Sequence, residues 1–231
     1  MRGWLLIALV GCEHGQTPGS DGSMPPFDGV TLPCSRETLI EGELVDWDST
    51  DASFLGVAGA TIEQVGDPTV VTTTPPNGRL QICANPALPF EFSINGSGDY
   101  LDGTLSVSPQ ISSLSIVPLS LRTLTASRVA SFLNIDLGVI FDPSAAQVVV
   151  FSAGDRATLS LDEPHEITFA GEDSGDGVIT WTPGATGRYV LFTNVTPSAS
   201  GGQLTGDPTG ARTIPLVGGR ISLVALAFVL E

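Results

Sequence analysis

The fold is decided by short stretches of one kind, of which Asn77-Gly78-Arg79-Leu80-Gln81-Ile82-Cys83 is the clearest. Asn-Gly is a tight-turn pair, and the residues after it alternate polar and apolar side chains, as in a strand with one buried face. Similar strand-sized runs recur about every ten residues, with Gly, Pro and Asn between them. This spacing predicts an all-β fold of tandem antiparallel β-sandwiches. The expected strands are residues 39–45, 60–65, 70–74, 79–83, 90–94, 103–107, 147–151, 157–161, 177–181, 188–194, 211–216 and 220–230.

One segment departs from this strand pattern. Residues 121–138 contain a stretch with helical spacing, with Thr125 as the candidate N-cap, Val129, Phe132 and Leu133 on one face and Gly138 as a stop signal. The 27 Gly and 17 Pro leave little room for longer helices. The sequence therefore predicts a single short helix.

The charge balance excludes one class of partner. The 231 residues include nine Arg, no Lys and 25 acidic residues, for a net charge of −16. A chain this acidic, without a basic cluster, repels the phosphates of nucleic acids. We expect no nucleic-acid partner.

The N-terminus resembles an export signal. Arg2 precedes a short apolar run, residues 4–10, which is too short to span a bilayer core of roughly 30 Å. The next residues complete the stretch Leu9-Val10-Gly11-Cys12, which resembles the lipobox of bacterial lipoproteins. The resemblance implies that residues 1–11 are a removable signal peptide and that Cys12 carries the lipid. A general signal peptide that happens to end near a cysteine is the alternative.

The segment after Cys12 predicts a tether. Residues 12–33 are rich in Gly, Ser, Pro and Asp, which is typical of a flexible linker. Of the remaining cysteines, Cys34 and Cys83 would reach an oxidising compartment and are expected to form a disulfide. Two free buried thiols are the alternative, and a cysteine pair alone makes a poor zinc site.

Four stretches follow one another in a particular order along the first half of the chain. They are Glu41-Gly42-Glu43-Leu44-Val45-Asp46, Gly56-Val57-Ala58-Gly59-Ala60-Thr61-Ile62, Asn77-Gly78-Arg79-Leu80-Gln81-Ile82 and Gly98-Asp99-Tyr100-Leu101. This order resembles the carboxypeptidase regulatory-like domain, and the resemblance implies a transthyretin-like or immunoglobulin-like β-sandwich over residues 34–118. A later stretch, residues 187–197, is similar to a motif of the same superfamily of sandwiches. It implies a second sandwich over residues 119–231, with the short helix at its start.

The sequence offers few residues for chemistry. We expect no catalytic residues, because His165 is the sole histidine of the folded part and no nucleophile elbow accompanies it. Asp173 and Asp176, in an acidic turn, are candidate Ca²⁺ ligands, although a solvated acidic turn explains them without a cofactor. Trp47 and Tyr100 are the candidate ligand-contacting residues, because exposed aromatic rings stack on sugars or fill a partner's pocket.

Together these patterns predict a lipid-anchored protein of the bacterial cell envelope. Glu13 after the lipidated residue favours the outer membrane under the common sorting rule. Its role is expected to be structural, adhesive or ligand-binding, with the membrane as one partner and an envelope protein or a polysaccharide as another. An envelope hydrolase, directed at glycan or peptide through acidic residues of the second sandwich, is the alternative.

Overall fold

The computed structural model describes residues 34, 38–46, 55–96, 98–107, 117–123, 126–152, 157–173, 179–206 and 211–226. All of them belong to one compact unit, Leu32–Glu231. The described residues do not include the linker of residues 12–33 with Cys12, nor Trp47 and Asp176. Cys34, which follows the linker directly, is described. In this part of the chain no helix is both long and apolar enough to cross a membrane.

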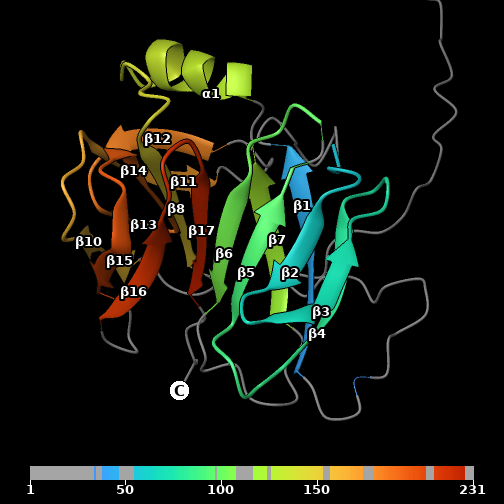
Figure 1. Ribbon diagram of the computed structural model, residues 1–231. Coiled ribbons are helices and arrows are strands. Elements are labelled where there is room, and N and C mark those ends of the chain that lie inside the picture. Colours follow the sequence, from blue (N-terminus) through green and yellow to red (C-terminus); the bar gives the residue numbers. More distant parts are fainter. Residues whose placement is uncertain are drawn as a thin grey trace, which may run out of the picture. The chain divides into compact units, whose positions relative to one another are not determined.

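The predicted all-β class, with one short helix, is confirmed (Figure 1). The strands of the first half are β1 Thr38–Asp46, β2 Thr61–Gln64, β3 Asp67–Thr73, β4 Arg79–Ala84, β5 Glu91–Asn95, β6 Gly103–Val107 and β7 Val117–Thr123. Those of the second half are β8 Ala146–Ser152, β9 Ala157–Thr158, β10 Ser160–Leu161, β11 Thr168–Asp173, β12 Ile179–Pro183, β13 Thr186–Gly187, β14 Tyr189–Val195, β15 Ser198–Thr205, β16 Arg212–Leu216 and β17 Ile221–Leu226. The helix is α1 Ala126–Ser131, which continues into a π-helical turn, η1 Phe132–Asp136.

A nine-stranded sheet in the order β12-β11-β14-β8-β17-β6-β5-β2-β3 joins both halves of the chain. Its middle strand, β17, pairs in parallel with β6 on one side and β8 on the other. The expected boundary between residues 118 and 119 therefore does not coincide with a break in the sheet. The parallel neighbours are far apart in the sequence, so no turn signal marks their pairing.

Burial along the strands follows their place in this sheet. All six residues of β17 are buried, and β8 and β14 are buried along nearly their whole length. Strands β2 and β5 instead alternate buried and half-buried residues. The continuous apolar runs thus belong to strands covered on both faces, and the alternating runs to strands with one covered face.

The first core lies between the nine-stranded sheet and a three-stranded sheet of order β4-β1-β7. Ile40 and Leu44 of the small sheet pack with Ile62 and Phe92 of the large one. This is the face-to-face packing expected of a β-sandwich.

The second core occupies the opposite face of the large sheet. Val148 of β8 and Phe192 of β14 pack there with Leu204 of β15 and Ile214 of β16, whereas the neighbouring Val149 belongs to the first core. Successive side chains of β8 thus enter different cores, so one sheet serves as a wall of both.

The helix behaves largely as its spacing predicts. Val129, Phe132 and Leu133 are buried in the first core, and Gly138 has a left-handed φ of 71° just after the helical segment. Residues 117–123 form β7, so the first part of the segment 121–138 is a strand, and α1 begins at Ala126, directly after Thr125, the N-cap that the sequence predicts. Strands β11 and β15 were not expected either; β15 contains Ser-Gly-Gly, a composition that favours turns.

The disulfide between Cys34 and Cys83 is confirmed. It links two residues 49 positions apart whose Cα atoms lie 5.5 Å from each other. A cross-link over a loop of this length contributes about 4 kcal/mol in the chain-entropy model. The bridge therefore ties the first described residue to β4.

Mass mapping checks this pairing directly. Cleavage after arginine separates the two cysteines, because Arg36 and Arg79 both lie between them. The non-reduced digest should contain one cross-linked pair of peptides, ending at Arg36 and at Arg122, that splits on reduction. Two free thiols in the purified protein would contradict the bridge.

Two glycines allow the Asn77-Gly78 turn to pack against β1. Gly78 has a left-handed φ of 70°, and a Cβ atom there would overlap the carbonyl oxygen of Leu44. A Cβ atom on Gly56 would overlap the backbone of Asn77. The turn therefore requires glycine for both conformation and space.

We predict that Gly78→Ala lowers the free energy of unfolding by about 3 kcal/mol, because it combines an unfavourable φ with a backbone overlap. Gly138→Ala is the matched control, since Gly138 has a similar φ of 71° but no atom within 4 Å of an added Cβ. It should cost only about 1 kcal/mol. Urea unfolding curves measure both changes, and equal losses would show that the close approach of the turn is not rigid.

Candidate functional site

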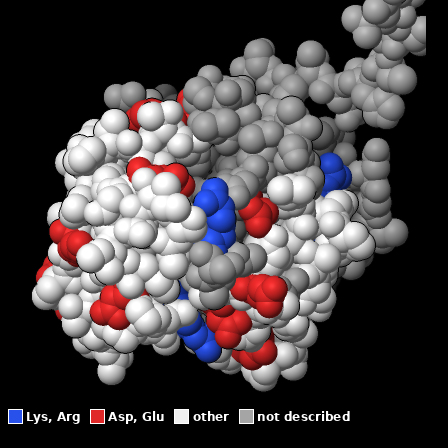
Figure 2. Space-filling model, turned by 90° about the horizontal axis from the view of Figure 1, so that it is seen from above, with Lys and Arg blue, Asp and Glu red and all other residues white. Residues whose placement is uncertain are grey.

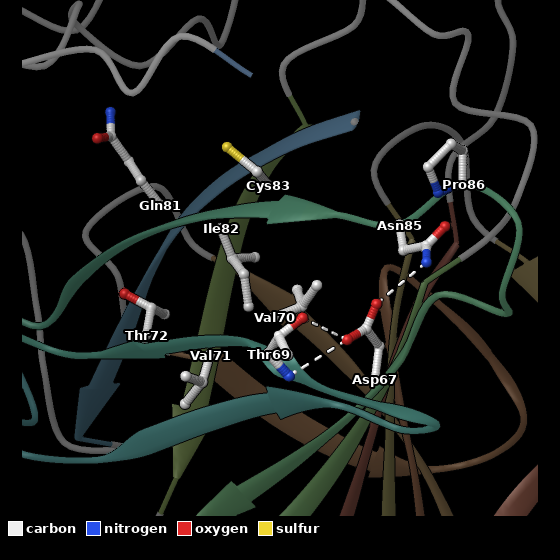
Figure 3. Close-up of a pocket in the computed structure, with 10 residues that line it drawn as sticks. All are labelled: Asp67, Thr69, Val70, Val71, Thr72, Gln81, Ile82, Cys83, Asn85 and Pro86. Atoms are coloured by element: carbon white, nitrogen blue, oxygen red, sulfur yellow. Dashed lines mark hydrogen bonds between the residues drawn. The ribbon is translucent and has the colours of Figure 1, made fainter. Parts of the chain in front are cut away.

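A groove of about 560 Å³ opens between β3 and β4. Strand β3 is the outer strand of the nine-stranded sheet, and β4 is an outer strand of the three-stranded one. The two strands are consecutive in the chain but belong to different sheets, so their facing sides are separated by the groove. It is lined by Asp67, Thr69, Val70, Val71, Thr72, Gln81, Ile82, Cys83, Asn85 and Pro86 (Figure 3).

Hydrogen bonds around Asp67 connect the two walls at one end of the groove. Asn85 Nδ2 donates to Asp67 Oδ2 at 3.1 Å, which joins the start of β3 to the segment after β4. The backbone N–H and the hydroxyl of Thr69 both donate to Asp67 Oδ1, at 3.2 and 2.6 Å (Figure 3). The carboxylate thus fixes the spacing of the walls at this end.

Gln64 supports this arrangement from inside the fold. Its side chain is fully buried, and its Nε2 donates to the carbonyl oxygens of Asn85 at 3.0 Å and Pro89 at 3.2 Å. Its Oε1 accepts a bond from the Asn85 N–H at 2.7 Å. These bonds anchor the loop after β4, as a buried amide requires. Sequence reasoning missed Gln64; its signal was a polar residue at an inward position of an alternating strand.

The groove has apolar side chains in its interior and a rim of both polar and apolar residues. Figure 3 shows Ile82 pointing from β4 toward β3, whereas Gln81 and Cys83 point to the other side of that strand. Val70 packs against the first core from the β3 side. Among the remaining lining residues, Asp67, Thr69, Thr72 and Asn85 carry carboxylate, hydroxyl or amide groups, whereas Val71 and Pro86 are apolar, and none of the lining residues is aromatic.

Asp67 is the sole charged residue of the lining. The hydrogen bond from the Thr69 side chain, followed by that from Asn85, lowers the pKa of Asp67 below its ordinary value. The carboxylate is therefore ionised at neutral pH and places one negative charge at one end of the groove.

The groove can bind through hydrogen bonds and apolar contact. Its lining contains no histidine and no free thiol, because Cys83 is bonded to Cys34. Asp67 is held by three donors of its own chain rather than by a reacting group. These features suit recognition rather than proton transfer.

The predicted calcium ligands are not brought together in the described part of the chain. Asp173 is exposed at the end of β11, and Asp176 lies outside the described residues. Among the residues that the structure describes, no group of three or more His, Cys, Asp or Glu side chains could hold a metal ion. Calcium binding stays a prediction.

Tyr100, a predicted ligand-contacting residue, lies half-buried against the first core. Its hydroxyl donates to Asp46 Oδ2 at 2.7 Å, which connects the β5–β6 loop to the end of β1. The other candidate, Trp47, follows Asp46 directly and lies outside the described residues. A ligand contact of either ring stays a prediction, and the groove is a separate site.

His165 and Asn194 have structural partners in the second half of the chain. His165 makes hydrogen bonds through both ring nitrogens, to the Glu163 carbonyl at 2.9 Å and to Thr168 Oγ1 at 3.0 Å. Asn194 has a left-handed φ of 48°, and its Nδ2 donates to the Ile140 carbonyl and to Glu166 Oε2, at 2.7 and 2.6 Å. These bonds stabilise the irregular end of β14 and explain why asparagine occupies that position.

Comparison with known proteins adds little to this site. No protein-family model matches the chain, so the resemblance to the carboxypeptidase regulatory-like domain stays a prediction. No curated protein matches it either.

Two solved structures are similar at 10% identity. The Bacillus anthracis TIE protein matches with a TM-score of 0.28 over 83% of this chain and 34% of its own, and a streptococcal ancillary pilin with 0.25 over 85% and 64%. The chain thus spans about a third of the first and under two thirds of the second. Both TM-scores are below 0.5.

The pKa of Asp67 provides a test of the groove's geometry. Thr69→Val removes the strongest hydrogen bond, so the pKa should rise toward its ordinary value of 3.8. Carboxyl ¹³C chemical shifts during an acid titration measure this change. Asp142 is the internal control, because Ser144 lowers its pKa in the same way elsewhere in the protein.

The lowered pKa of Asp67 also determines how the stability of the fold depends on pH. A carboxyl whose folded pKa is lowered stabilises the fold above its ordinary pKa, and that contribution is lost as pH falls through the folded value. Thr69→Val should therefore weaken the fold at neutral pH and reduce the acid dependence that Asp67 contributes. An unchanged Asp67 titration would show that Thr69 does not hold the carboxylate.

Proposed function

We propose that this protein is an exported β-sandwich module of the bacterial cell envelope. It is held at a membrane, most simply the outer membrane, by lipid on Cys12, and it has a structural, adhesive or ligand-binding role. The observation that carries the proposal is the Cys34–Cys83 bridge. Structural disulfides form and persist in oxidising compartments, which agrees with the export signal expected at residues 1–11.

The position of the bridge suits an anchored module. The proposed tether of residues 12–33 ends directly before Cys34, which is covalently bonded to β4. The disulfide therefore gives any pull between the membrane and the folded unit a second covalent path, from Cys34 to β4 in addition to the backbone. Such an attachment fits a spacer or an adhesion module.

The groove between β3 and β4 supports a binding role. It combines an apolar interior, hydrogen-bonding groups and a single charge on a rigid frame, as ligand sites do. By contrast, two acidic residues of the second half have roles in the fold: Asp162 accepts a hydrogen bond from the Gln203 N–H at 2.6 Å, and Glu166 accepts one from Asn194. No observation favours the alternative of an envelope hydrolase.

The surface charge agrees with anchoring by lipid rather than by electrostatics. On the face drawn in Figure 2, acidic side chains are scattered between wide uncharged areas and basic side chains are few. Arg79 and Arg220 lie within ion-pair distance of Glu43 and Asp102. An acidic protein of this kind is repelled by anionic lipid headgroups, so acyl chains must provide the attachment.

We predict that Cys12→Ser moves the protein from the membrane fraction to the soluble fraction, because it removes the residue that carries the lipid. Immunoblots of fractionated cells that express the full chain measure the distribution. The matched control is the double variant Cys34→Ser and Cys83→Ser, which also loses cysteines but should remain with the membrane. Membrane association of the Cys12→Ser protein would exclude the proposed anchor.

A further inference from the structure

The edge of β3 that faces away from β2 has a definite set of exposed backbone groups. The Thr74 N–H donates to the Ala60 carbonyl at 2.9 Å, which makes this a hydrogen-bonded pair between the two segments. Hydrogen-bonded residues alternate along an antiparallel pair, so the pair Ile62 and Thr72, two positions further, is of the same kind. Thr61 and Thr73, which lie between these two pairs, direct their N–H and C=O groups away from each other.

The pairing of β2 with β5 gives an independent check. The Val65 N–H donates to the Glu91 carbonyl at 2.8 Å, which shows that the odd-numbered residues of this segment bond to β5 and the even-numbered ones to β3. By the same alternation, Val71 and Thr73 direct their N–H and C=O groups away from β2. Among the described strands β3 pairs only with β2, so these four groups have no strand partner.

This edge also lacks the usual protection against pairing with another strand. Residues 68–73 read Pro-Thr-Val-Val-Thr-Thr, without a charged side chain, and the chain contains no Lys. Natural edge strands carry charges, Lys above all, or prolines and bulges. Here Pro68 and the bulge that follows it protect only the first part of β3, and Val71 is 50% exposed in the regular part.

We propose that the β3–β4 groove binds an extended, β-branched segment of a partner protein, which adds to β3 as a further strand and places a basic residue at its end near Asp67. This inference deepens the proposed binding role and rests on it. Backbone bonds to Val71 and Thr73 supply the pairing, and alternate side chains of the segment enter the apolar interior beside Val70 and Ile82. The partner segment is expected to have a basic residue at one end, because Asp67 is the one charged residue of the lining and the chain as a whole is acidic.

The lining favours a protein segment over a polysaccharide. Sugar sites rely on aromatic rings that stack on the sugar face, and none of the groove's lining residues is aromatic. An exposed strand edge, in contrast, matches the repeat of an extended peptide, whose N–H and C=O groups alternate in the same way.

The test uses the purified full chain and a fluorescein-labelled peptide, Arg-Thr-Val-Thr-Val-Thr. Fluorescence anisotropy should show saturable binding, and hydrogen exchange should show protection of the Val71 and Thr73 amides when the peptide is present. A peptide with an N-methyl group on every residue should bind at least about tenfold more weakly, because neither of its edges can donate a backbone hydrogen bond to β3. Replacing the arginine by glutamate should also weaken binding.

A pair of variants isolates the backbone contact. Val71→Pro removes an N–H that points away from β2 and should weaken peptide binding by about tenfold or more, whereas Val71→Thr keeps the N–H and should change it by less than about twofold. Thermal unfolding confirms that both variants are folded. If Val71→Pro does not fold, the N-methylated peptide and the exchange data on the unaltered chain still decide the question.

Three results would overturn the inference. They are the absence of saturable binding, equal binding of the N-methylated peptide, and a concentration-dependent dimer in sedimentation that Val71→Pro abolishes. The last would assign the edge to a second copy of this chain. None of these results bears on the proposed membrane anchor, which fractionation of the Cys12→Ser protein tests separately.

Discussion

The architecture depends on the burial of β17 between β6 and β8. This strand comes last among the described elements, is buried on both faces and pairs in parallel with strands from the two halves of the chain. Its side chains alternate between the two cores: Leu223 packs in the first and Val224 in the second. Burying six residues on both faces stabilises the sheet by the hydrophobic effect, and it joins two segments that otherwise have separate antiparallel neighbours.

The groove follows from the opposite arrangement at the far end of the same sheet. There, β3 and β4 are consecutive in the chain, yet each pairs with a partner in a different sheet. Strands that diverge in this way leave two edges facing each other. Asp67 and Asn85 hold one end of the gap, and Gln64 supports it from below. The same sandwich packing that builds the first core therefore creates the groove at its open side.

Sequence reasoning found the features that local chemistry determines. The β-class, the helix with Val129, Phe132 and Leu133 inward, the turn at Gly78 and the Cys34–Cys83 bridge all agree with the structure. It did not find the groove. None of the groove's residues was singled out for binding, because Thr, Val and Asn in an edge strand look like ordinary strand and turn residues. Gln64 alone carried a readable signal, as a polar residue at a buried position.

The sequence by itself thus determined most of the extended segments, several of their turns and which cysteines pair, since alternation, Asn-Gly turns and cysteine counts act over a few residues or by elimination. The tertiary structure alone decided that β17 lies between β6 and β8 and that β3 and β4 enter different sheets. Both depend on contacts between residues distant in the chain, where the free energy of folding comes from the packing of whole faces. Similar apolar strands contain no local sequence signal that specifies which strand they pair with.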